Sequence, residues 1–136
     1  MTPAELLSGR MPTDFEIDAI ARRTLERLPS PFRESLSEIV LLVEPVADPD
    51  TARSVGLDHP MRLSGLYQGV PLHQRSVSQS GTLPERVTLY SRPIFAEWRS
   101  TRFSLEQIVS HIVIHEIGHH FGFSDDDMHA LEDSIE

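Results

Sequence analysis

The sequence predicts an α+β fold in which a few short strands accompany one central, largely buried helix. Three segments have the length and the β-branched or alternating character of strands, namely residues 39–43, 63–70 and 86–90. One long apolar segment, residues 104–121, has helical periodicity and a capping pattern at its start. Helices and strands mixed in this proportion are typical of a layered α+β domain.

The first helix is predicted over residues 14–28, with Asp14 as its cap and Pro29 at its end. Its apolar residues recur at helical spacing on one face: Ile17, Ile20, Ala21, Leu25 and Leu28. Residues 1–12 show no such pattern. We therefore expect 1–12 to form a flexible N-terminal arm and 13–136 to form a single domain.

The predicted strands differ in character. Residues 39–43 form a continuous apolar run that ends before Pro45, as a buried strand does. Residues 63–70 contain two glycines and predict a strand with a bend. In residues 86–90, apolar and polar residues alternate, which places Val87 and Leu89 on one face of a strand. The rest is expected to be mostly loop, including 73–85, with short helices or turns at 31–36, 51–55 and 93–99.

The central helix begins with a capping box, because Ser104 is followed three residues later by Gln107. Gly122 suits the left-handed position that ends a helix, so the helix should stop after Phe121. Its apolar residues cover a broad face: Leu105, Ile108, Val109, Ile112, Val113, Ile117 and Phe121. A last helix of about two turns is expected to follow Asp125.

Composition excludes several kinds of chemistry. Cys, Lys and Asn are absent, so the chain has no thiol nucleophile and no Schiff-base lysine. The formal net charge of −9 disfavours non-specific binding to nucleic acid. No apolar run approaches the length of a membrane span, and the first residues lack the pattern of a signal peptide. We therefore expect a cytoplasmic protein that binds neither membranes nor nucleic acid.

The central helix contains an H-E-x-x-H motif, His115-Glu-Ile-Gly-His119. Four residues advance ~400° around a helix, so the two imidazoles lie within ~40° of each other and ~6 Å apart along the axis. Both can therefore ligate one Zn²⁺ ion. Glu116 is rotated by ~100° from His115, which places its carboxylate beside the metal as a general base for zinc-bound water.

A catalytic zinc ion needs a third protein ligand. Asp125 is the first candidate, because Gly122 lets the chain reverse and Asp125 follows three residues later. Capping the last helix is the alternative role for Asp125. Glu132, delivered by a returning helix, is the second candidate ligand. His111 lies on the same helical stripe but ~12 Å from His119 along the axis, so it is expected to support the site or pack in the core.

The segment His111-Ile-Val-Ile-His-Glu-Ile-Gly-His-His-Phe-Gly-Phe-Ser-Asp125 resembles a family of small bacterial zincin-like proteins. Residues 65–72 and 83–90 are also similar to that family, so the resemblance extends from about residue 14 onward. It implies a minimal zincin fold, with a small twisted sheet against an active-site helix. It also implies metal-binding roles for His115, His119 and Asp125, and the base role for Glu116.

In zincins, an edge strand above the active-site helix typically binds the peptide substrate. Residues 87–90 are the segment that we expect to form this edge. Tyr67, His73 and Tyr90 are candidates for stabilising an oxyanion, and spacing does not choose among them.

The leading hypothesis is a zinc-dependent metallopeptidase that acts on a peptide or protein substrate. One alternative is a metal-dependent endoribonuclease, because His115, His119 and Asp125 match the H-x3-H-x5-H spacing of ribosomal-RNA maturation nucleases with Asp in the last place. A second alternative is a non-catalytic, metal-stabilised module that binds a protein partner. The oligomeric state is not predicted by the sequence.

Overall fold

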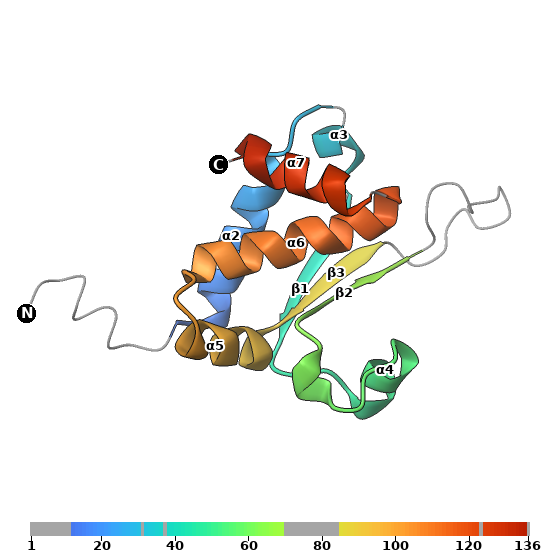
Figure 1. Cartoon of the computed structure of the whole chain (residues 1–136). Coiled ribbons are helices and arrows are strands. Elements are labelled where there is room, and N and C mark those ends of the chain that lie inside the picture. Colours follow the sequence, from blue (N-terminus) through green and yellow to red (C-terminus); the bar gives the residue numbers. More distant parts are fainter. Residues whose placement is uncertain (1–11, 31, 37, 70–84, 123, 136) are drawn as a thin grey trace, which may run out of the picture.

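The computed structural model of the chain describes residues 12–30, 32–36, 38–69, 85–122 and 124–135. It is an α+β structure in which a small mixed sheet carries helices on one face (Figure 1). The elements in chain order are α2 (Asp14–Glu26), α3 (Phe32–Ser35), β1 (Val40–Glu44), α4 (Pro49–Ser54), the 3-10 helix η1 (Pro60–Arg62), β2 (Gly65–Gln68), β3 (Arg86–Tyr90), α5 (Ser91–Ser100), α6 (Leu105–Phe121) and α7 (Asp125–Ile135).

The sheet has the strand order β1-β3-β2, so β3 is the central strand. β1 is parallel to β3, and β2 is antiparallel to it. The prediction that residues 87–90 form an edge strand is therefore wrong. β3 is buried from Val87 through Tyr90 and pairs on both sides, whereas β2 forms the edge next to α6.

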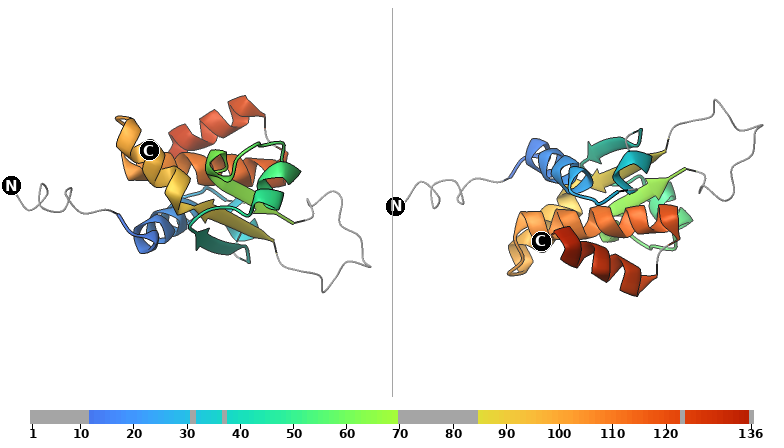
Figure 2. Two further views of the ribbon diagram at one scale, coloured as in Figure 1. Left: turned by 90° about the horizontal axis from the view of Figure 1, so that it is seen from below. Right: turned by 90° about the horizontal axis from the view of Figure 1, so that it is seen from above.

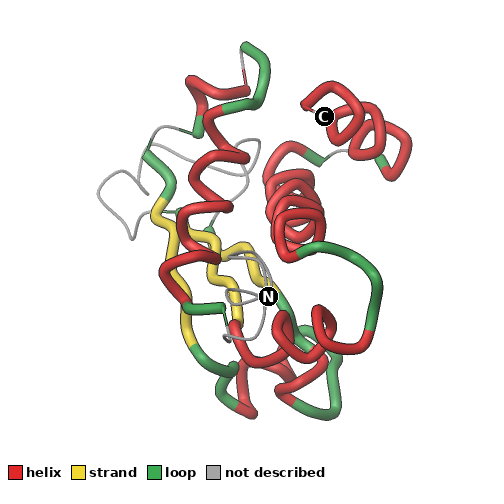
Figure 3. The backbone as a smooth tube through the Cα atoms, turned by 90° about the vertical axis from the view of Figure 1, so that its left-hand side faces the viewer, coloured by secondary structure: helices red, strands yellow, loops and turns green. Residues whose placement is uncertain are grey.

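The main core lies between the sheet and the pair α2 and α6. Val87 and Leu89 of β3 point into it, and Ile17 of α2 and Ile117 of α6 are fully buried there. α6 lies between the sheet on one side and α7 on the other, as Figure 3 shows with α6 seen nearly end-on. A smaller cluster on the opposite face of the sheet contains Tyr90.

α6 has the ends that its sequence predicts. The Ser104 Oγ accepts a 3.0 Å hydrogen bond from the Gln107 N–H, and the Gln107 Oε1 accepts one of 2.8 Å from the Ser104 N–H. Gly122 follows the helix with a φ of 70°, in the left-handed region where glycine is favoured. The capping box and the predicted stop are both confirmed.

Other helix boundaries differ from those predicted. Thr13, rather than Asp14, is the N-cap of α2, because its side chain accepts a hydrogen bond from the Glu16 N–H. α2 ends at Glu26 rather than at residue 28, and α5 and α7 are longer than expected. Residues 1–11 and 70–84, which hold most of the expected arm and of the loop at 73–85, lie outside the described residues.

Within the described ranges, no helix is both long enough and apolar enough to cross a lipid bilayer.

Candidate active site

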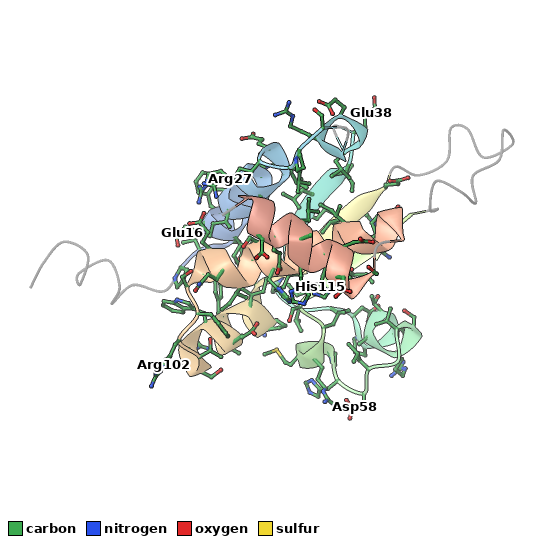
Figure 4. All side chains as sticks on the ribbon, turned by 45° about the horizontal axis from the view of Figure 1, so that its top comes forward. Glu16, Arg27, Glu38, Asp58, Arg102 and His115 are labelled. Atoms are coloured by element: carbon green, nitrogen blue, oxygen red, sulfur yellow. The ribbon has the colours of Figure 1, made fainter. Side chains whose placement is uncertain are left out.

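The H-E-x-x-H motif lies in the C-terminal half of α6, where the helix is unbroken through Phe121. The Cα atoms of His115 and His119 are therefore one turn apart on one face, ~6 Å along the axis. His115 and Glu116 are both half-buried, and His115 lies near the middle of the view in Figure 4. The His119 side chain lies outside the described part of the structure.

Glu116 is held by the edge strand. Its Oε2 accepts a 3.0 Å hydrogen bond from the backbone N–H of Tyr67 on β2. The Tyr90 N–H donates to the Ser64 carbonyl at 2.9 Å, and antiparallel alternation then directs the N–H of Tyr67 away from β3. Glu116 therefore reaches from α6, the helix that also carries His115, to the outer edge of the sheet.

A glycine lets α6 approach β2 closely enough for this contact. A Cβ atom at Gly65 would lie 2.5 Å from the Cγ2 of Ile112 and 3.5 Å from the Cγ of Glu116. Any side chain at this position would force the Ile112 side chain or the helix to shift. The sequence shows the glycine but not its partner, because the contact joins distant segments of the chain.

His111 and Glu132 form a second polar contact one turn before the motif. The His111 Nδ1 and the Glu132 Oε1 are 2.5 Å apart, and this contact joins α6 to α7. The rings of His111 and His115 are also close, with centroids 4.4 Å apart and planes tilted by 49°. The structure thus places Glu132, the second candidate ligand, against His111.

α7 returns antiparallel to α6, and both views in Figure 2 show the two helices side by side. Its start is capped by Ser124, whose Oγ accepts a 3.1 Å hydrogen bond from the Asp127 N–H, while the Asp127 Oδ2 accepts one of 3.2 Å from the Ser124 N–H. Asp125 is therefore the first residue of α7 and not its cap. The Asp125 side chain lies outside the described part.

The position of Asp125 on α7 can be compared with that of residues that touch α6. Met128 is buried, and a Cβ atom at Gly118 would collide with its side chain, so the two helices are in close contact there. Asp125, Met128 and Glu132 recur at a spacing of three and four residues, which places them on one stripe of α7. Both candidate third ligands therefore belong to the stripe that faces α6.

The fold separates the two tyrosines that are candidates for the oxyanion role. Tyr90 is 4% exposed and belongs to the cluster with Ala47 and Leu63, on the face of the sheet away from α6. Burial, together with the Glu44 carboxylate, raises the pKa of Tyr90. Tyr67 packs against the main core on the α6 side, and His73 lies outside the described residues.

Among the side chains that the structure describes, no group of three histidine, aspartate or glutamate residues is arranged to hold a metal ion. Two of the three expected zinc ligands, His119 and Asp125, have side chains outside that set. The backbone nevertheless fits the expected donors. An unbroken α6 keeps the two histidines one turn apart, and the Ser124 cap removes the alternative role of Asp125.

The chain was also compared with known proteins. No curated protein matches it. The family model described as "Zincin-like metallopeptidase" matches residues 36–135, which include the sheet, α6 and α7. The chain therefore belongs to the family of zincin-like metallopeptidases.

Proposed function

We propose that this chain is a zinc-dependent metallopeptidase, with His115, His119 and Asp125 as the metal ligands and Glu116 as the general base. The observation that carries the proposal is the hydrogen bond from the Tyr67 N–H to the Glu116 carboxylate. This bond supports the base role, because it holds the Glu116 carboxylate at the outer edge of β2, on the same helix as His115.

The edge strand supplies a place for the substrate. The N–H and C=O of Gly65 and the C=O of Tyr67 point away from β3, so an extended peptide can pair with them as a fourth strand while the Tyr67 N–H stays bonded to Glu116. A peptide bound there would run beside Glu116. The family assignment and the net charge of −9 favour a peptide over an RNA substrate.

The chemistry follows from these positions. A bound zinc ion supplies a Lewis acid that polarises a carbonyl group and acidifies water. Glu116 accepts the proton of the attacking water and then delivers it to the leaving amine. The Tyr67 N–H bonds to one oxygen of this carboxylate, Oε2, and so holds the side chain against β2.

Glu116→Gln tests this proposal, because it removes the base and keeps the size of the side chain. We expect zinc binding to persist while cleavage of a fluorogenic peptide library falls by at least ~10²-fold. Glu106→Gln is the matched control, since Glu106 is exposed on the same helix and pairs with Arg27 at 3.5 Å. Unchanged cleavage by Glu116→Gln would refute the proposed mechanism.

A further inference from the structure

A pocket of about 350 Å³ lies along α6, on the N-terminal side of the motif. α6 forms its floor with Ile108, His111 and Ile112. α7 contributes Glu132 to the wall, and α5 and the loop after it contribute Glu97 and Phe103. We refer to this cavity as the α6 pocket.

The α6 pocket adjoins the proposed site on two sides. His111 lines it, and the His111 ring lies 4.4 Å from the ring of His115. Ile112 also lines it and approaches β2 at Gly65, which belongs to the strand proposed to bind the peptide. A peptide on the outer edge of β2 would therefore have a side chain within reach of the pocket.

The size of the pocket is close to the lower end for small-ligand sites, which span roughly 300–1,000 Å³. Such a volume suits one long side chain of a peptide. Phe103, 58% exposed, and the isoleucines Ile108 and Ile112 supply an apolar surface for a chain of methylene groups.

The charge of the pocket selects among long side chains. Its ionisable groups are Glu97, Glu132 and His111, and no arginine is among the described residues that line it. The two carboxylates outnumber the single imidazole. Glu97 has no described hydrogen-bond or ion-pair partner for its carboxylate, so that group is available to a cationic ligand.

We propose that the α6 pocket binds the side chain of an arginine or lysine residue in the peptide substrate. The methylene groups of that side chain pack on Phe103, Ile108 and Ile112, and its cationic head lies against Glu97 and Glu132. This assignment rests on the proposed peptidase function and adds a specificity determinant to it.

Binding can be measured without cleavage in the zinc-loaded Glu116→Gln variant. The probes are fluorescently labelled alanine-rich hexapeptides, in which one position at a time carries arginine, citrulline, norleucine or glutamate. Citrulline matches the shape of arginine without its charge. At one position we expect arginine to bind about 10-fold more tightly than citrulline, because a charge-assisted contact is lost. Equal affinities at every position, a preference for norleucine, or no binding of any peptide would overturn the proposal.

Variants of the pocket assign the effect to its residues. Adding Glu97→Gln should reduce the preference for arginine over citrulline to ~3-fold or less, whereas Glu106→Gln, outside the lining, should leave it unchanged. A preference that persists in Glu97→Gln and in Glu132→Gln would also refute the assignment. Cleavage of peptides with no preference for basic residues would refute only the assignment of the α6 pocket. Tighter binding of arginine peptides, with no cleavage by the wild-type protein, would refute only the proposed peptidase function.

Discussion

The backbone N–H of Tyr67 donates a hydrogen bond to the carboxylate of Glu116, 49 positions further along the chain. The contact joins the outer edge of the sheet to the helix with the H-E-x-x-H motif. It depends on the close approach of α6 to β2 at Gly65. The position of the candidate base is thus set by backbone packing as well as by its own helix.

Gly65→Ala should therefore destabilise the protein. The added Cβ atom would lie 2.5 Å from the Cγ2 of the half-buried Ile112, and we expect the free energy of unfolding to fall by ~1–3 kcal/mol. Urea denaturation measures the change. The double variant Gly65→Ala/Ile112→Ala removes the clashing atom, so its loss should be smaller than the sum of the two single losses. Strict additivity would contradict the predicted contact.

The third zinc ligand can be identified by comparing two substitutions on α7. We expect Asp125→Ala to weaken zinc binding by at least ~10²-fold, measured by competition with a chromophoric chelator, because one of three protein ligands is lost. Glu132→Gln should weaken it by ~10-fold or less, since Glu132 contacts His111. The reverse order of effects would assign the ligand role to Glu132.

The capping box of α6 predicts a contrast between two serines on that helix. Ser104→Ala removes the acceptor for the Gln107 N–H, and the free energy of unfolding should fall by ~1 kcal/mol. Among the described residues, the Ser110 hydroxyl bonds only to backbone carbonyls of its own helix, so Ser110→Ala should change stability by less than ~0.5 kcal/mol. Equal losses in thermal or urea unfolding would show that the cap is not formed.

Tyr90 predicts a loss of stability in alkaline solution. Burial raises its pKa in the folded state above the unfolded value of about 10, so the folded protein holds the phenolic proton more tightly. This contribution to stability is fully present below pH ~10 and is lost as the pH rises through the folded pKa. Urea unfolding at a series of pH values from 8 to 11 should show the loss. Tyr90→Phe should reduce it, and an equal decline in that variant would assign the effect to other groups.

The features predicted correctly from the sequence depend on local interactions. The ends of α6 follow from contacts between Ser104 and Gln107 and from the backbone of Gly122, all within a few residues. The N-cap of α2 was misplaced by one position because Thr13 and Asp14 are both good caps and a single hydrogen bond decides between them.

The features that were missed depend on contacts between distant segments. Strand order is set by pairing across the sheet, so the alternation in residues 86–90 could not show that β3 is central. The Tyr67–Glu116 hydrogen bond joins residues that are 49 positions apart in the sequence. The His111–Glu132 contact joins residues that are 21 positions apart. The α6 pocket likewise combines residues from α5, α6 and α7.

Asp125 and Glu132 belong to a single three-turn helix that is fastened at its start by Ser124. One helix thus carries both the proposed metal ligand and a wall residue of the α6 pocket. Any tilt or slide of α7 would displace the two together, so mutations that alter its packing at Met128 should change turnover and side-chain preference in parallel.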